Sequence, residues 1–406
     1  MAPNQLCTTA IVLNRLPGEA ISHPEQKDPS FIERAPEDYL NDVETPYRYI
    51  GYTTSEKSNG QQWKVARYGT NELKGAWQEL KSPTIHGLSG PQLCAPALSY
   101  EFVDGKPSYY LYIQTACFEL GGVIMEAEST DGLTFHGKPE PLVTKDSIEN
   151  PKCAVIGVYD PSYSQVIVDG KMHDCLTFTG ITKINPCQPH QAMGDIYMML
   201  RDRTVRGAKW SKPKLALDMK DISFHNQPKK AKEGKCTYEW CPEGTQVIGL
   251  DDTHYLMVGV CFLGREGLGD GERQRVFLAA ADNINGPFVA FARPFKPVDA
   301  RGENGHPDTV VDWKNQILEV ILQERGNRLP DGKDAPWGLR HGEIELARLK
   351  PLMEEAVARR RQGLPDIDLT DHLRNSVLPI PETQVHHTQL SMPLSDIAQV
   401  EQRNLR

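Results

Sequence analysis

The sequence predicts an all-β fold: a five-bladed β-propeller of four-stranded antiparallel blades, followed by a short C-terminal helix and an extended tail. First, 33 Gly and 30 Pro among 406 residues favour many short strands joined by turns. Second, one layout recurs, in which a polar group beside Pro or Gly precedes an alternating strand, a tight turn and a second strand. Third, these repeats start at positions 28, 95, 160, 243 and 306. The spacing between successive starts matches the length of a four-stranded propeller blade with long loops.

The clearest repeat is the third, which begins at Asp160-Pro161 and continues through an Asp169-Gly170 turn into a second strand. The first repeat begins at Asp28-Pro29, with later strands near residues 47–53 and 63–70. The second begins at Ala95-Pro96, with later strands near 109–113 and 122–127. The fourth begins at Glu243-Gly244 and continues at 254–259, and the fifth begins at His306-Pro307 and ends with a strand over 341–349.

A β-sandwich is the alternative, because its strands also alternate. The placement of the polar groups favours the propeller. The first strand of each blade lines the central axis, so groups at five blade starts converge at one end of the channel, whereas a sandwich would not gather them.

Composition narrows the function classes. The net charge of −9 argues against a nucleic-acid surface, and no run approaches the length of a membrane span. We expect a cytoplasmic protein, because no secretory signal is visible. The nine cysteines lack zinc-type spacing and are expected to be free thiols in a reducing compartment.

The character of the chain changes after Leu349, which predicts a propeller over residues 1–349 and a separate C-terminal part over 350–406. Apolar residues at helical spacing from Leu352 to Val357 predict an amphipathic helix. The rest is expected to be a tail that packs over the propeller or forms a homodimer contact. Residues 33–46 form an insertion in the first repeat, which we expect to overhang the channel mouth.

Three carboxylates and one imidazole stand at the blade starts: Asp28, Asp160, Glu243 and His306. Glycoside hydrolysis needs one carboxylate to activate water and one protonated acid to reach the leaving oxygen. A third negative charge can raise the pKa of the acid so that it stays protonated near neutral pH. A funnel with three acids around its axis can supply these roles.

With these motifs in order, the sequence resembles the five-bladed glycoside hydrolases, closest to glycoside hydrolase family 43. The resemblance spans Asp28 to Leu349 and implies Asp28 as general base, Asp160 as pKa modulator and Glu243 as general acid. It also implies that His306 helps to hold a hydrated calcium ion, with no other cofactor required. The chain departs from the family pattern at Cys94, where Trp is usual, and at Thr245, where Pro is usual.

Other residues are candidates for substrate binding. Glu239, in Glu239-Trp240-Cys241-Pro242, resembles the acid of invertase-like propellers and is a rival to Glu243. Tyr159 and Trp240 are expected to stack on a sugar ring. His225 and Arg265 lie in loops expected to reach the same mouth.

The resulting hypothesis is an inverting enzyme that cleaves an α-arabinofuranosidic or β-xylosidic bond in a small glycoside. The alternative keeps the fold and binds an apolar small molecule in the same funnel, promoting a cyclisation or cycloaddition, as a Diels-Alderase does, in natural-product biosynthesis. A third hypothesis is a non-catalytic propeller that presents loops to a protein partner.

Overall fold

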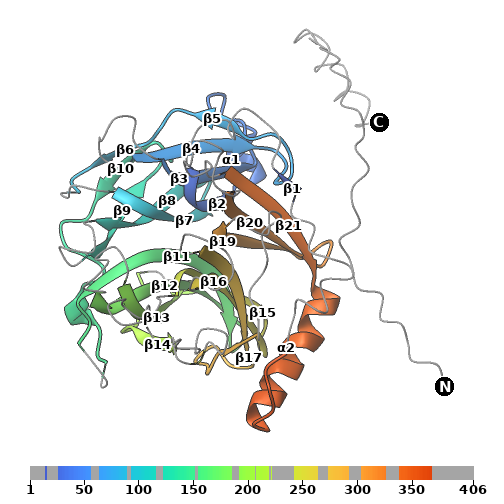
Figure 1. Cartoon of the computed structure of the whole chain (residues 1–406). Coiled ribbons are helices and arrows are strands. Elements are labelled where there is room, and N and C mark those ends of the chain that lie inside the picture. Colours follow the sequence, from blue (N-terminus) through green and yellow to red (C-terminus); the bar gives the residue numbers. More distant parts are fainter. Residues whose placement is uncertain are drawn as a thin grey trace, which may run out of the picture.

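The computed structural model shows a ring of five blades, with the first strand of each blade near the centre (Figure 1). The five-bladed prediction is therefore confirmed. The structure describes residues 14–15, 26–55, 64–88, 93–115, 122–150, 154–184, 192–205, 207–218, 221, 242–263, 273–291, 303–325 and 338–367.

The blades follow the chain in order, and each has antiparallel neighbours. The first contains β2 (Gln26–Glu33), β3 (Tyr49–Ser55), β4 (Lys64–Thr70) and β5 (Gln78–Leu80). The second contains β7 (Leu93–Val103), β8 (Lys106–Thr115), β9 (Val123–Ser129) and β10 (Thr134–Gly137). The third contains β11 (Gly157–Val168), β12 (Lys171–Ile184), β13 (Ala192–Asp202) and β14 (Lys214–Leu217). The fourth contains β15 (Glu243–Asp251), β16 (His254–Leu263), β17 (Arg273–Ala281) and β18 (Val289–Ala290), and the fifth contains β19 (Glu303–Asp312), β20 (Ile317–Arg325) and β21 (Gly338–Glu345).

Two short strands complete the sheets in ways that the repeat pattern does not indicate. The fourth strand of the last blade is β1 (Asn14–Arg15), from the start of the chain, which pairs antiparallel with β21. In the second blade, β6 (Thr84–His86) adds a fifth strand that runs parallel to β10. The ring is thus closed by the N-terminal strand.

All five inner strands contain the same irregularity, a β-bulge with one extra residue. The first bulge residue has a positive φ in every blade: Asp28 (50°), Ala95 (48°), Asp160 (47°), Gly244 (50°) and His306 (40°). Proline follows in four of the five, and proline has no N–H to donate to a sheet ladder. The Asp-Pro and His-Pro motifs are therefore bulges that take one residue out of the ladder.

A buried carboxyl group also joins the inner strands of neighbouring blades. Asp308 accepts hydrogen bonds from the Phe31 amide of β2 and from the Gln246 side chain of β15, both at 2.6 Å. Burial raises the pKa of Asp308 to about 7, against the lowering effect of these hydrogen bonds. This contact ties three blades together below the bulges.

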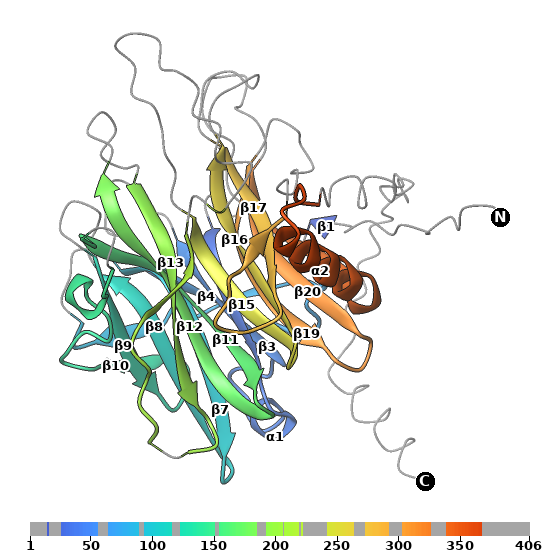
Figure 2. The same cartoon turned by 90° about the horizontal axis from the view of Figure 1, so that it is seen from below.

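The helix α2 (Leu346–Arg361) confirms the predicted C-terminal helix and begins a few residues earlier than expected. Its buried residues, among them Leu349 and Met353, share one hydrophobic core with the fourth and fifth blades. Lys350 and Glu354 form ion pairs with Asp251 and His254 at the turn between β15 and β16. Figure 2 shows the helix lying against these blades.

Two shorter helical segments also occur, α1 (Pro36–Tyr39) and a 3-10 turn (Lys145–Ser147). Among the described residues, no helix is both long and apolar enough to span a membrane. The described cysteines, Cys94, Cys175 and Cys261, are free thiols, in agreement with the prediction.

Candidate active site

The bulges place side chains in the channel. The backbone amides at the bulges do not pair within their own sheet and donate instead to side chains of the preceding blade. The Asp28 amide donates to Gln323 Oε1 at 2.8 Å, and the Asp160 amide donates to Gln114 Oε1 at 3.0 Å. Ala95 has the same arrangement with Thr54. In each pair the acceptor lies on the second strand of the preceding blade, so the position of each bulge depends on its neighbour.

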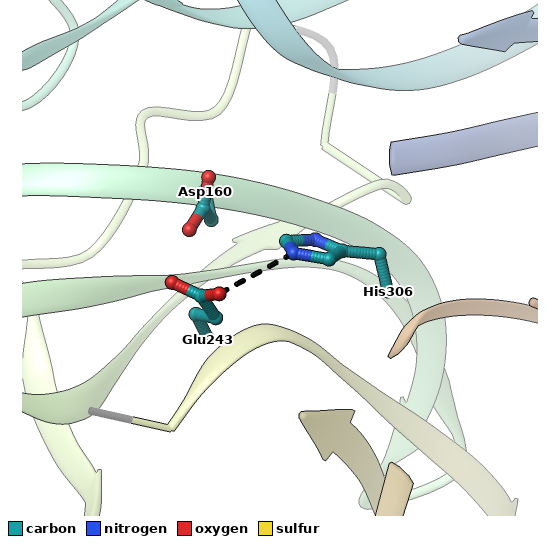
Figure 3. A group of neighbouring side chains, drawn as sticks. All are labelled: Asp160, Glu243 and His306. Atoms are coloured by element: carbon teal, nitrogen blue, oxygen red, sulfur yellow. Dashed lines mark ion pairs between the residues drawn. The ribbon is translucent and has the colours of Figure 1, made fainter. Parts of the chain in front are cut away.

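His306 connects the two carboxylates predicted to be base and acid. Its Nδ1 lies 3.1 Å from Asp28 Oδ1. Its Nε2 lies 3.5 Å from Glu243 Oε1, and Figure 3 marks this second contact with a dashed line. Two such contacts and the width of one imidazole ring set an upper limit of about 9 Å on the separation of the paired oxygens, and this limit does not exceed the range of an inverting pair. The structure therefore brings Asp28 and Glu243 to opposite sides of one ring.

Asp160 faces Glu243 beside the same ring (Figure 3), and the ligand atoms of Asp160, Glu243 and His306 lie within 4.8 Å of one another. Burial, together with the negative charges of Glu243 and Asp28, raises the pKa of Asp160 well above its usual range. A carboxyl group beside a second carboxyl group keeps its proton to a higher pH, because ionisation would bring two like charges together. Asp160 therefore holds a proton next to Glu243.

His306 is the cation of the cluster. Burial by itself would lower its pKa, but the charge of Asp28 and the hydrogen bond to Glu243 more than offset that effect and raise the pKa to about 10. The imidazole is therefore protonated at neutral pH. Its ion pairs are shielded from water, since its side chain is 9% exposed and those of Asp28 and Glu243 are 15% and 11% exposed.

The fourth blade differs from the others at its bulge. The residue equivalent to Asp28, Asp160 and His306 is Gly244, and Glu243 is the last paired residue before the bulge. Counting Glu243 as the equivalent blade start was therefore wrong by one residue. The reason is steric: a Cβ on residue 244 would lie 2.4 Å from His306 Nδ1, so only glycine leaves room for that ring.

A cavity of about 20 Å³ lies among the bulges, lined by residues that include Asp28, Asp160, Gly244 and His306. Such a volume holds about one water molecule. A sugar ring does not fit in it and would have to lie over the carboxylates, outside the cavity.

Of the residues predicted to bind substrate, the structure describes only Tyr159. Tyr159 is only 1% exposed, and its hydroxyl accepts a hydrogen bond from the Gly122 amide, so it offers no free face to a sugar. The stacking prediction for Tyr159 is wrong for this reason. Glu239, Trp240, His225 and Arg265 lie outside the described residues.

The insertion over residues 33–46 also lies elsewhere than expected. Asp28 is near the start of β2, and the insertion begins at Glu33, at the other end of that strand. The five-residue step from Asp28 to Glu33 spans about 16 Å of strand. Within the insertion, the buried Arg34 binds Asp38, which also accepts hydrogen bonds from Tyr100 and Tyr109. The insertion thus packs at the opposite end of the channel from the acids.

The implied calcium ion does not fit these donors. Calcium takes about six to eight oxygen ligands, whereas the cluster offers two carboxyl groups and one imidazole. We therefore assign no step to a metal.

The glutamines that support the site were not predicted from the sequence. Gln323 and Gln114 occupy corresponding places near the ends of the second strands β20 and β8, and Gln274 on β17 donates to Glu243 Oε1 at 3.3 Å. The available signal was a glutamine after the apolar run of a second strand, in Ile113-Gln114 and Leu322-Gln323.

Comparison with known proteins identifies the fold. An endo-arabinase from Bacteroides thetaiotaomicron superposes with a TM-score of 0.50 at 15% sequence identity, covering 82% of this chain and 96% of that one. The chain has the five-bladed propeller fold of that protein.

A second solved structure, the catalytic domain of a GH62 α-L-arabinofuranosidase from Coprinopsis cinerea, gives a TM-score of 0.49 at 14% identity, covering 83% of this chain and 97% of that one. No family model and no curated protein matches the sequence. At these identities the likeness shows the fold alone, and the function has to be argued from the site.

Proposed function

We propose that the protein hydrolyses glycosidic bonds with inversion, acting on α-arabinofuranosides or β-xylosides. The observation that carries this proposal is the placement of Asp28 and Glu243 on opposite sides of the protonated His306, with Asp160 beside Glu243. An inverting enzyme needs two carboxyl groups separated by the space for a water molecule and the anomeric carbon.

In the proposed reaction Asp28 acts as the base. It accepts a proton from the attacking water as the new bond to the anomeric carbon forms, and the bond to the leaving oxygen breaks on the opposite face. Glu243 donates a proton to that leaving oxygen. The proton comes from the pair that Glu243 forms with Asp160, because Asp160 holds it in the free protein.

The charge of the cluster suits this reaction. Asp160 is protonated and His306 is cationic, and both lie against the carboxyl groups of Asp28 and Glu243. A glycosidic transition state develops positive charge on the sugar, and a preorganised negative environment stabilises it.

The choice of sugar rests on resemblance rather than on the described walls of the site. The blade motifs resemble a family that acts mainly on arabinofuranosides and xylosides, and the structure with the shared fold is named an endo-arabinase. The cyclisation alternative has no comparable set of contacts in its favour among the described residues.

The test is a hydrolysis assay with 4-nitrophenyl α-L-arabinofuranoside and β-D-xyloside, comparing wild type with Asp28→Asn and Glu243→Gln. We expect turnover by wild type and a loss of about 10³-fold or more in each variant. Asp104→Asn, at an exposed turn of the second blade, is the matched control and should keep full activity. A folded wild type that is inert on a broad glycoside panel would contradict the proposal.

A further inference from the structure

We infer that two glutamines, Gln274 and Gln323, position the acid Glu243 and the base Asp28 relative to each other through a continuous hydrogen-bonded relay. This inference rests on the proposed hydrolysis. It assigns a role to residues that act through Asp28 and Glu243, so they are positioning residues.

The relay consists of three successive hydrogen bonds. The Asp28 amide donates to Gln323 Oε1 at 2.8 Å, Gln323 Nε2 donates to Gln274 Oε1 at 3.0 Å, and Gln274 Nε2 donates to Glu243 Oε1 at 3.3 Å. It runs from the first blade through the fifth to the fourth. The two carboxylate-bearing residues are therefore joined a second time, independently of His306.

The direction of the relay is fixed at its first bond. A backbone N–H can only donate, so the oxygen of Gln323 must face Asp28 and its amino group must face Gln274. The same reasoning turns the amino group of Gln274 toward Glu243. Bonds aligned head to tail in this way polarise one another, which strengthens the last bond in the series.

The backbone of the fifth blade leaves room for this arrangement. A Cβ on Gly305 would lie 2.5 Å from Gln274 Oε1, closer than any real contact. Gly305 immediately precedes His306 on β19. The segment that presents the imidazole therefore also leaves space for the Gln274 side chain. Gln323 is 1% exposed, which shields its amide from competing water.

The relay determines which oxygen of Glu243 can deliver a proton. Both Gln274 Nε2 and His306 Nε2 approach Oε1. A carboxyl oxygen that faces two donors is a poor place for a proton, so Oε2 is left to carry it and to reach the leaving oxygen. The predicted effect of the relay is thus on protonation of the leaving group.

The test compares two substrates that differ in their need for an acid. Methyl α-L-arabinofuranoside has a leaving group that must be protonated, whereas 2,4-dinitrophenyl α-L-arabinofuranoside has one that departs without help. For Gln274→Met, which keeps the length of the side chain and removes its donor, kcat on the methyl glycoside should fall by about ten-fold or more. KM should stay the same, and kcat on the dinitrophenyl glycoside should change by less than about two-fold.

Two further variants keep the inference independent of that one substitution. Gly305→Ala removes no atom of the relay but displaces Gln274, and it should show the same substrate-selective loss. Gln165→Met makes the same chemical change at an exposed position on β11 and should behave as wild type on both substrates.

The outcomes separate this inference from the proposed function. If wild type cleaves neither these arabinofuranosides nor the corresponding methyl and 2,4-dinitrophenyl β-D-xylosides, the proposed function fails. If wild type cleaves both and Gln274→Met slows both equally, the residue only supports the fold and the inference is overturned. Behaviour of Gln274→Met like that of Gln165→Met would overturn it as well.

Discussion

The backbone of Gly244 packs directly against the imidazole ring of His306. A Cβ at residue 244 would lie 2.4 Å from His306 Nδ1, and Gly244 also has a φ of 50°, a conformation that glycine adopts readily. The fourth bulge can therefore hold no side chain, and the acid of that blade has to come from the preceding residue, Glu243.

Replacement of Gly244 by alanine should displace His306 and abolish most activity. The positive φ alone costs about 1–2 kcal/mol for a residue with a Cβ. Gly170→Ala isolates that backbone effect, because Gly170 has a φ of 71° and a Cβ added there would meet no atom within 4 Å. Urea unfolding should show a larger loss for Gly244→Ala than for Gly170→Ala, and equal losses would contradict the steric account.

The protonated state of His306 predicts a pH dependence of stability. The acids around it raise its pKa from 6.5 to about 10, so folding favours the protonated form. The resulting stabilisation is complete below pH 6.5 and is lost as pH rises through about 10. We expect the Tm of wild type to fall more steeply between about pH 7 and pH 10 than that of His306→Gln.

His173→Gln is the control for this experiment, because His173 is a partly exposed histidine on β12, away from the acid cluster. It should retain the wild-type slope. Parallel pH profiles for wild type and His306→Gln would show that His306 is not held as a cation.

Removal of divalent metal should leave the enzyme unchanged. A cationic His306 between Asp28 and Glu243 already neutralises charge where a metal would sit. Dialysis against EDTA should alter neither the initial rate nor the Tm, and added CaCl₂ should not raise the Tm. A rise of several degrees on adding calcium would restore the metal site implied by the sequence resemblance.

The packing of α2 predicts that the helix is part of the folded core. Met353 is 1% exposed among apolar residues of the fourth and fifth blades, so Met353→Ala should lower the free energy of unfolding by about 2–5 kcal/mol. Glu355→Ala, on the exposed side of the same helix, should change it by about 0.5 kcal/mol or less. Urea denaturation measures both, and equal effects would mean that the helix is not docked.

The sequence predicted those parts of the structure that depend on local patterns. Asp28-Pro29 and Asp160-Pro161 mark bulges because proline cannot donate to a ladder, and their spacing revealed the blades. The sequence also predicted that Asp28, Asp160, Glu243 and His306 lie close together, because the inner strands of all blades meet at the propeller axis.

Features that depend on distant contacts could not be predicted in the same way. The strand β1 has two residues, too few for any periodicity, and exists because β21 pairs with it. Gln274 lies in no recurring pattern, and the Leu322-Gln323 pattern does not reveal a role, since that role depends on the glutamine of another blade 3.0 Å away. The burial of Tyr159 depends on a distant contact, because its hydroxyl accepts a hydrogen bond from the Gly122 amide. Nothing in the local sequence of Tyr159 indicates that contact.

Closure of the ring by β1 imposes an order on folding during synthesis. Asn14 and Arg15 leave the ribosome before the other described strands, yet their partners His341 and Arg340 are among the last residues of the propeller to emerge. The edge of β1 must stay unpaired while the intervening blades form, and an unpaired strand edge can join a second chain. A nascent ring is therefore open to exchange of its first strand between neighbouring molecules until the last blade is complete.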